Sequence, residues 1–302
     1  MSDEARAEAG AAGVAALAPA KVNLWLHVLG RRADGYHLLD SLVVFTDDVG
    51  DRIEVGPADE LRFAVEGPFA ADVPAGGDNL VVRAARALAA EAGRPARASI
   101  RLEKRLPVAA GIGGGSADAA ATLRALSSLW GVRLEARALD RIALGLGADV
   151  PMCLHGRPVH VGGIGEEIEP APALPTFGLL LVNPRIPLPT PPVFARRAGP
   201  FSQAARLSAR PHDAKALAAL LAERRNDLTD AATSIVPAVA DVLGALAGLP
   251  DVLLARMSGS GATCFGLCES HETAARAASA LAARHPGWWI AAASVAGTVA
   301  ND

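Results

Sequence analysis

Cysteine and aromatic residues are scarce in this chain of 302 residues. It contains three cysteines, one tyrosine and 4% aromatic residues in all. An odd number of cysteines, in a chain long enough to bury a core without covalent links, excludes the disulfide scaffold of small secreted proteins. We expect Cys153, Cys264 and Cys268 to be free thiols in the cytoplasm. Their spacing, together with that of His155, does not match structural zinc sites, so no metal held by protein side chains is predicted.

Long apolar runs and an excess of positive charge are also missing. Pro19, Lys21 and Asn23 interrupt the most apolar N-terminal stretch before it reaches the roughly 18 to 20 residues of a membrane span. Positions 3, 4 and 8 are acidic, unlike the basic start of a signal peptide. The formal net charge of −3 provides no basic footprint for nucleic acid. We therefore expect neither a membrane nor nucleic acid as a partner.

The composition predicts a globular protein with two domains. Apolar residues make up 51% of the chain and charged residues 20%, a balance typical of chains that fold. The length favours two domains. A proline-rich stretch at 169–175 precedes a second series of strands and alanine-rich helices, so we place the boundary near Pro175. The predicted domains are residues 1–174, of which 1–17 form a flexible tail, and residues 175–302.

The first half of the chain has a β-rich start followed by helices. Residues 21–29 alternate between apolar and polar side chains, which predicts a half-buried strand. Asp78 or Asn79 can cap a following helix, and Gly131 ends another. The predicted elements are strands over 21–29, 38–45, 51–55 and 99–106, helices over 79–92, 116–130 and 135–146, and a hairpin over 159–170.

Glycines gather in the loop at 107–115, between a predicted strand and a predicted helix. In GIGGGSADAA, residues 111–120, they let backbone amides approach a ligand, and the helix start adds unpaired N–H groups and partial positive charge. This pattern predicts an anion site; a turn that uses glycine only for its φ angles is the alternative. No lysine follows as in GxxxxGK[ST], and Ser116 stands where GxGxxG needs its third glycine. Protein-kinase, HExxH and GxSxG motifs do not occur in the sequence either.

The glycine loop resembles the phosphate loop of the GHMP kinases, whose pattern is PxxxGxGSSAA. Pro107, Gly111, Gly113 and Ser116 match this pattern. Gly114 or Gly115 stands where many members have a first serine, and this GGGS form is similar to one branch of the family. Further segments resemble that branch in the expected order and span most of the chain: residues 18–45 with PAK and DGYH, then LGADVP, IPLPTPPVF, NDL and ARMSGSGA.

The resemblance implies an α+β fold of two domains, an N-terminal domain like ribosomal protein S5 and a C-terminal ferredoxin-like domain, with the active site in the cleft between them. It implies transfer of the γ-phosphoryl of ATP, with Mg2+, to the 2-hydroxyl of 4-diphosphocytidyl-2-C-methyl-D-erythritol in the non-mevalonate isoprenoid pathway. Asp149 would take the proton of the attacking hydroxyl, and Lys21 would orient and polarise the reacting centre. These roles suit phosphoryl transfer, where positioning and charge neutralisation contribute most. The oligomeric state stays open.

The same resemblance assigns ligand positions. Tyr36 and His37 would read the cytosine, Phe194 would complete the sandwich, and Asn23 and Thr190 would add polar contacts to the substrate. The positions that match nucleotide contacts are Pro107, Gly111, Gly113, Gly114, Gly115, Ser116, Asn79 and Lys104.

Each of these residues also has an ordinary interpretation. Asp149 and Asn79 can be helix caps, Lys21 a solvated residue on a strand and Lys104 a strand charge. Tyr36, His37 and Phe194 can be a hairpin aromatic, a turn residue and a core residue. Two alternative functions remain open. A GHMP kinase for another small alcohol, such as homoserine or mevalonate, would have no base to stack, and a non-catalytic RNA-binding module would need a basic face.

Overall fold

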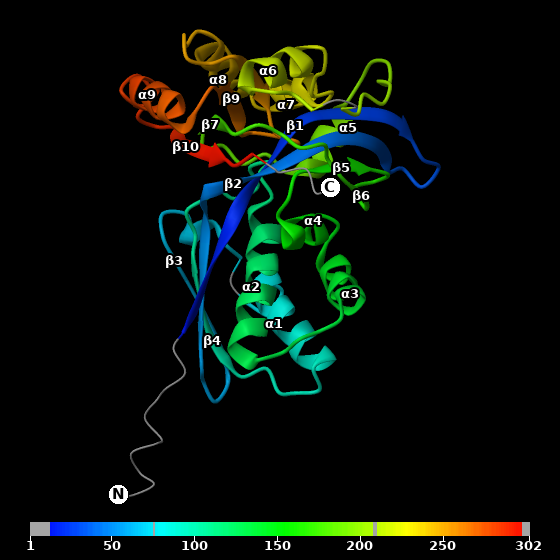
Figure 1. Ribbon diagram of the computed structural model, residues 1–302, viewed down its shortest axis with the longest axis vertical. Coiled ribbons are helices and arrows are strands. Elements are labelled where there is room, and N and C mark those ends of the chain that lie inside the picture. The colour runs from blue at the N-terminus through cyan, green and yellow to red at the C-terminus, as the bar shows by residue number, and fades with distance from the viewer. Residues whose placement is uncertain (1–12, 75, 208–209, 298–302) are drawn as a thin grey trace, which may run out of the picture. The chain divides into compact units, whose positions relative to one another are not determined.

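The computed structural model describes residues 13–74, 76–207 and 210–297, and the chain divides into two compact units (Figure 1). The first unit holds residues up to 18, 50–106 and 115–154, and the second holds 19–49, 107–114 and the residues from 155 onward. The domain boundary predicted near Pro175 rests on the sequence alone and stays a prediction. Most of the expected tail, residues 1–12, lies outside the described residues, whereas Val14–Leu17 already belong to a strand.

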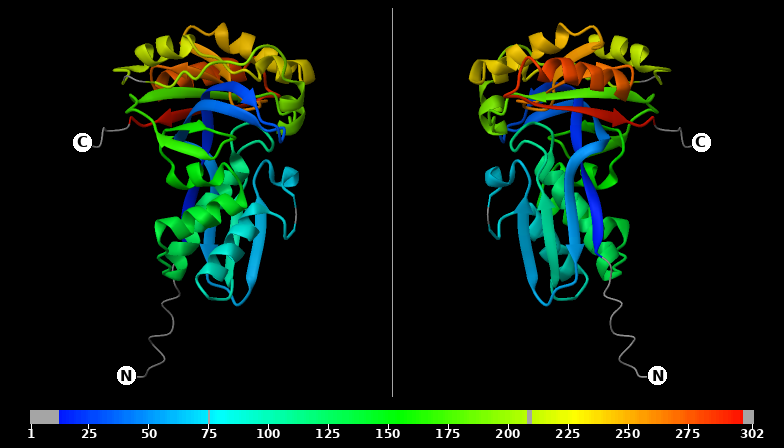
Figure 2. Two further views of the ribbon diagram at one scale, coloured as in Figure 1. Left: turned by 90° about the vertical axis from the view of Figure 1, so that its right-hand side faces the viewer. Right: turned by 90° about the vertical axis from the view of Figure 1, so that its left-hand side faces the viewer.

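A sheet with helices on one of its faces forms the first unit (Figures 1 and 2). β4 (Ala98–Glu103) pairs in parallel with β3 (Leu61–Glu66) and antiparallel with residues 52–56 of β2 (His37–Gly56). Small buried side chains, such as Ala117 and Ala120, let the central helix pack closely. The helices are α1 (Leu80–Glu91), α2 (Gly114–Trp130), α3 (Ala136–Leu146), α4 (Val150–His155) and the short 3₁₀ helix Ala70–Asp72.

The second unit contains an antiparallel sheet in the order β10-β7-β9-β8, with α8 and α9 on one face (Figures 1 and 2). Its core joins Val242 and Leu246 of α8, Ala277 of α9 and Val182 of β7. The elements are β7 (Phe177–Asn183), β8 (Leu254–Met257), β9 (Cys264–Cys268), β10 (Trp289–Val295), α5 (Thr190–Arg196), α6 (Ala214–Ala222), α7 (Thr229–Ile235), α8 (Ala238–Ala247) and α9 (His271–Ala282).

Strands from the start of the chain complete the second unit. β1 (Val14–Arg31) pairs with β2, residues 41–43 of β2 pair antiparallel with β5 (Val159–Gly162), and β5 pairs with β6 (Glu167–Pro170). The hairpin predicted over 159–170 is therefore confirmed. The two predicted strands at 38–45 and 51–55 are parts of the single strand β2.

The prediction that residues 21–29 form a half-buried strand is wrong, because both faces of β1 are buried from Ala20 to Val28. On the polar face, Lys21 is 7% exposed and Asn23 is 5% exposed. Alternation predicts one solvated face only when nothing else covers the polar side chains. In β1 other polar groups of the second unit cover these side chains, as Asn23 shows by its hydrogen bonds with Ser41 and Ser258.

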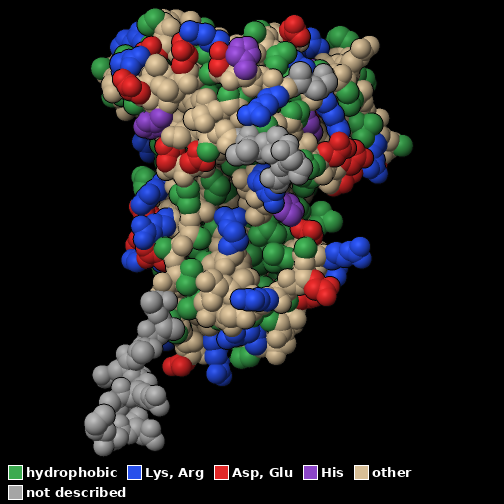
Figure 3. All heavy atoms as spheres, in the orientation of Figure 1, with side chains coloured by type: hydrophobic (Ala, Val, Ile, Leu, Met, Phe, Trp, Pro, Cys, Tyr) green, Lys and Arg blue, Asp and Glu red, His purple; other side chains and the backbone are tan. Residues whose placement is uncertain are grey.

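The other local predictions agree closely with the structure. Asn79 caps α1 by accepting a hydrogen bond from the Val81 N–H at 2.9 Å, as one of the two predicted caps. None of the three cysteines forms a disulfide bond within the described residues, and burial raises the pKa of Cys268 to about 12. Among the described helices, none is long and apolar enough to cross a membrane. Acidic and basic side chains are interspersed on the face in Figure 3.

Candidate functional site

The loop that precedes α2 is held at four consecutive residues. The carbonyl of Ala109 accepts from Leu188 N–H, and that of Ala110 accepts from Thr263 N–H. The carbonyl of Gly111 accepts from the Ser258 hydroxyl at 3.0 Å, and that of Ile112 accepts from Lys21 N–H at 3.0 Å. Because β1, the segment before α5 and the segment before β9 all bind this loop, its backbone is fixed before any ligand arrives.

Two glycines of the loop are required by geometry. Gly111 has φ of +74°, and a Cβ there would lie 2.5 Å from the Ser258 carbonyl oxygen and 2.7 Å from that of Gly261. Gly113 has φ of +66°, and its Cβ would lie 3.1 Å from Cβ of Lys21. Left-handed backbone and close approach both select glycine. The alternative interpretation, in which glycine is needed only for its φ angle, does not account for the close contacts of Gly111 and Gly113.

The helix after the loop begins two residues earlier than predicted. α2 starts at Gly114, so Gly114, Gly115 and Ser116 form its first turn and do not belong to the loop. Positive φ at Gly113 ends the loop, and the next glycines can take helical angles. The first N–H groups of a helix lack partners within the helix, so this turn offers the donors that a phosphate needs.

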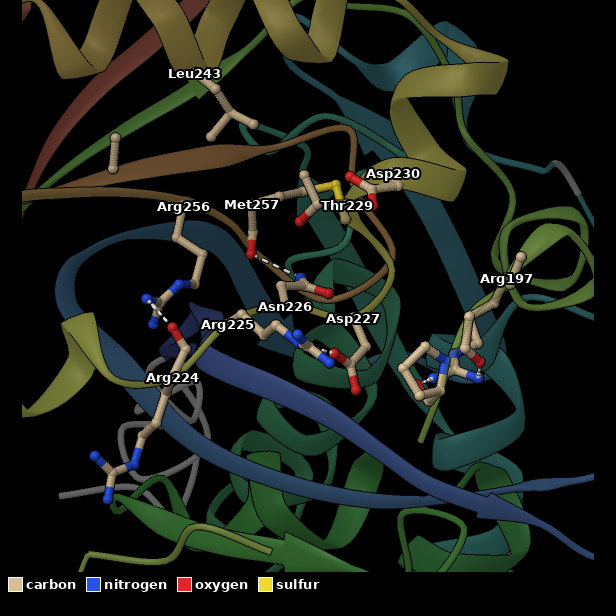
Figure 4. A pocket seen from close by; sticks show the side chains of 14 residues that line it. Arg197, Arg224, Arg225, Asn226, Asp227, Thr229, Asp230, Leu243, Arg256 and Met257 are labelled. Carbon is tan, nitrogen blue, oxygen red and sulfur yellow. Dashed lines mark hydrogen bonds and ion pairs between the residues drawn. The ribbon is translucent and has the colours of Figure 1, made fainter. Parts of the chain in front are cut away.

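A second glycine-containing loop, residues 258–261, packs against Gly111. Asn226 binds the backbone at this loop. Its amide donates to the carbonyls of Met257 and Gly259, each at 2.8 Å, and its Oδ1 accepts from Leu228 N–H. Figure 4 shows the bond from Asn226 to Met257. Thr190, a predicted substrate contact at the start of α5, shares a hydrogen bond of 2.8 Å with Ser260. The loop thus links α5 to the glycine loop.

Lys21 and Asn23 lie next to this assembly on β1. The aliphatic chain of Lys21 packs against Gly113. Asn23 donates its backbone N–H to the Ser258 hydroxyl at 3.1 Å and its side-chain amide to the Ser41 hydroxyl at 2.8 Å. The Asn23 Oδ1 atom is buried and has no hydrogen-bond partner among the described residues. A buried acceptor without a partner costs free energy, so a donor group such as a hydroxyl fits this position.

Two of the three predicted base-binding residues contact each other in the second unit. The rings of His37 and Phe194 stack with centroids 5.2 Å apart, and Tyr36 is 60% exposed in the turn before β2. The pKa of His37 is lowered by burial and by the positive charges of Arg31 and Arg197. His37 is therefore neutral near pH 7, with one ring nitrogen that donates and one that accepts.

The remaining predicted residues belong to the first unit. Asp149 stands directly before α4, and its carbonyl accepts from Cys153 N–H at 3.2 Å. Asn79 is a helix cap whose Oδ1 atom accepts from Val81 N–H, so this oxygen is already used. Lys104 is 3% exposed and forms ion pairs with Asp51 at 2.5 Å and with Asp118 at 2.8 Å. Lys104 is therefore a buried, ion-paired charge directly after β4.

Asn226 also lines a cavity of about 420 Å³ (Figure 4). None of the residues predicted for the site lines it. Arg256 is buried there and donates to the carbonyls of Leu24, Leu221 and Arg224, while burial and the Arg224 charge lower its pKa to about 10. This guanidinium therefore ties β1 to β8 and supports the strand that leads into the loop at 258–261.

The structure thus joins most of the predicted site residues of the second unit and adds several that the sequence analysis did not assign. Ser41, Asn226 and Ser258 hold Asn23 and the two glycine loops. The segments NDL and ARMSGSGA contain two of them, but we used those segments only as signs of family resemblance. Polar residues inside apolar segments were the signal that could have identified them.

Comparisons with known proteins agree with this arrangement. The family GHMP kinases N terminal domain matches residues 79–157, and the family GHMP kinases C terminal matches residues 203–287. A 4-diphosphocytidyl-2-C-methyl-D-erythritol kinase of Paramagnetospirillum magneticum is 59% identical over 92% of this chain and 97% of its own length. One of Cereibacter sphaeroides is 54% identical over 93% and 99%.

Solved structures give the same result. The chain resembles a crystal structure of 4-(cytidine 5'-diphospho)-2C-methyl-D-erythritol kinase, with 37% identity, a TM-score of 0.78, and coverage of 94% of this chain and 100% of that one. It also shares its fold with a homoserine kinase from Cytophaga hutchinsonii, at 19% identity, a TM-score of 0.72, and coverage of 94% and 95%. The predicted two-domain fold and the predicted ATP-dependent kinase class are both confirmed. With relatives this similar over nearly their whole length, the chain belongs to the GHMP kinases.

Proposed function

We propose that this chain transfers the γ-phosphoryl of ATP to the 2-hydroxyl of 4-diphosphocytidyl-2-C-methyl-D-erythritol. The observation that carries the proposal is the stacked pair of His37 and Phe194, with the exposed Tyr36 next to His37 in the sequence. The relatives at 59% and 54% identity carry the name of this activity, which supports the same acceptor here. Buried reduced cysteines support the cytoplasm as its location.

Tyr36, His37 and Phe194 would bind the cytosine. The rings of Tyr36 and Phe194 offer faces for stacking, which contributes roughly 1 to 3 kcal/mol per base. Neutral His37 offers both a donor and an acceptor to the polar edge of the base. Asn23, with its unpartnered Oδ1, and Thr190 would bind polar groups of the substrate.

The glycine loop and the first turn of α2 would hold the triphosphate. Gly111, Gly113, Gly114, Gly115 and Ser116 present backbone close to a ligand, and N–H groups at a helix start favour anions. Pro107 begins the segment, and Asn79 stays a proposed contact through its side-chain amide. Mg2+, bound with the triphosphate, would neutralise charge on the phosphate oxygens.

Transfer needs one bond to form and one to break. The substrate 2-hydroxyl oxygen attacks the γ-phosphorus, the bond from this phosphorus to the β–γ bridging oxygen breaks, and ADP leaves. In our proposal Asp149 accepts the hydroxyl proton, and the ammonium of Lys21 orients and polarises the reacting centre. A positioned carboxylate suffices as base because positioning and charge neutralisation contribute most of the catalysis.

Homoserine and mevalonate, which relatives with the same fold accept according to their names, are the alternative acceptors. Neither carries a base, so neither would use Tyr36 and Phe194. The likeness to those structures is below 20% identity and shows the fold alone.

The test is an acceptor comparison with purified protein, ATP and Mg2+. We expect ADP release with 4-diphosphocytidyl-2-C-methyl-D-erythritol, and a new phosphate on its 2-hydroxyl by phosphorus NMR. Homoserine and mevalonate, at the same concentrations, should release no more ADP than a sample without acceptor. ADP release with one of them alone would overturn the assignment of Tyr36, His37 and Phe194.

A further inference from the structure

Three ionisable side chains are buried together in the first unit, and the proposed reaction uses neither carboxylate of the group. The ammonium of Lys104 lies 2.5 Å from Asp51 Oδ2 and 2.8 Å from Asp118 Oδ2. Their exposed fractions are 3%, 0% and 3% respectively. We call Asp51, Lys104 and Asp118 the acid-lysine cluster. It joins β2, the end of β4 and α2.

Asp51 is fully engaged in this cluster. Its Oδ1 accepts from the backbone N–H groups of Arg105 at 2.6 Å and Leu106 at 2.8 Å, while its Oδ2 accepts from Lys104. Three donors therefore bind this one carboxylate. Asp51 thereby sets the path of the two residues that lead into Pro107 and the glycine loop.

Asp118 is the less satisfied acid. One of its oxygens accepts from Lys104, but Oδ1 is buried without a hydrogen-bond partner among the described residues. The charged groups of the described chain that act on Asp118 are Lys104 and Asp51, so a single ammonium faces two carboxyl groups. Burial and the Asp51 charge raise the pKa of Asp118 and the Lys104 charge lowers it, which together bring this pKa to about 8. A proton on Asp118, donated toward Asp51, makes the cluster neutral.

The position of Asp118 makes its charge matter to the nucleotide. Asp118 lies four residues after Gly114, about 6 Å along the axis from the start of α2. A buried negative charge at this distance opposes the binding of a triphosphate at the helix start. The Lys104 side chain is buried, and its ammonium forms ion pairs with both acids.

We propose that Lys104 and Asp118 are positioning residues for ATP: with Asp51 they hold the start of α2 against the end of β4, and a proton on Asp118 keeps the cluster neutral while the triphosphate is bound. This inference rests on the proposed function only in placing the triphosphate at the start of α2. Lys104 then acts through the two acids and not as a direct nucleotide ligand.

The first experiment follows nucleotide binding against pH. We expect the Kd for ADP and the KM for ATP of the wild type to rise about tenfold between pH 7 and pH 9, with a smaller change in kcat, because Asp118 ionises. Asp118→Asn is neutral at every pH and should keep the low values throughout. Glu91→Gln, which removes an exposed partner of Arg141 in the same unit, is the matched control and should retain the wild-type profile. An Asp118→Asn profile identical to that of the wild type would overturn the proposal.

The second experiment separates a positioning role of Lys104 from direct contact. If Lys104 acts through the acids, Lys104→Met should weaken ADP binding less in the Asp118→Asn background than in the wild type. An equal loss in both backgrounds would mean that Lys104 contacts the nucleotide itself. ADP titration needs no acceptor, so failure of the proposed acceptor would leave the ADP Kd values of both experiments valid.

Discussion

The sharpest prediction concerns Gly111, which we replace by alanine. Alanine at φ of +74° costs about 1 to 2 kcal/mol for left-handed backbone alone. Its Cβ would also lie 2.5 to 2.8 Å from three backbone atoms of the loop at 258–261, and such overlap costs about 1 to 3 kcal/mol more. The sum, about 3 kcal/mol, should lower the Tm by roughly 10 °C at 2 to 4 °C per kcal/mol.

Gly93→Ala is the matched control for this change. Gly93 has φ of +62°, but a Cβ there would meet nothing within 4 Å among the described residues. It should show only the backbone cost of about 1 to 2 kcal/mol and normal turnover. Gly111→Ala should in addition lose about 100-fold in kcat/KM, because the loop must shift by a few tenths of an ångström to an ångström. Calorimetry and ADP release measure the two effects. Equal Tm values for the two variants, with wild-type turnover, would refute the tight packing of the two loops.

Four further changes test other parts of the site. Asp149→Ala should lower kcat by roughly 10² to 10⁴ with an unchanged Tm, measured by ADP release and calorimetry; near-normal turnover removes Asp149 as the base. Phe194→Ala should raise the KM for the cytidine substrate about 5- to 100-fold and leave the KM for ATP unchanged, and a rise below twofold would argue against stacking. Asn226→Ala leaves two buried carbonyls and one N–H without their partner, so the free energy of unfolding, measured with denaturant, should fall by about 3 kcal/mol. The control Ser234→Ala, on α7, should lower it by less than about 1 kcal/mol. The folded protein holds the proton of Asp118 up to a pKa of about 8, against 3.8 unfolded, so the free energy of unfolding should fall by up to about 1.4 kcal/mol per pH unit from pH 4 to 8. Asp118→Asn should reduce that slope, and an unchanged slope would contradict the raised pKa.

Local elements were predictable from sequence because local chemistry determines them. The Asn79 cap, the end of α2 at Gly131 and the hairpin at 159–170 depend on neighbours within a few residues. The glycine loop was identified for the same reason, since the glycines and the following helix start are neighbours in the sequence. Its first turn was missed by two residues because helix boundaries depend on single φ values.

Features that depend on distant segments were not predictable. Ala109 has φ of +51° although alanine rarely adopts it, and the hydrogen bond from Leu188, 79 positions away, accompanies this conformation. The bonds from Asn226 to the carbonyls of Met257 and Gly259 cross more than 30 positions. The spacing of residues along the sequence does not predict such long-range hydrogen bonds. Asn226 therefore entered the prediction only as part of the NDL segment that resembles the family.

The polar face of β1 shows why function and prediction diverge at the same residues. An alternating strand is expected to expose its polar side chains, because burying them costs free energy unless each finds a partner. In β1 they are buried, and Asn23 keeps one oxygen without a partner among the described residues. Asp118, in the first unit, also keeps one buried oxygen without a hydrogen-bond partner among the described residues. Local rules fail where a protein retains costly groups for a task, and both oxygens lie on elements that would meet the substrate or the phosphates. Burial of these two oxygens costs free energy at positions that the proposed reaction would use.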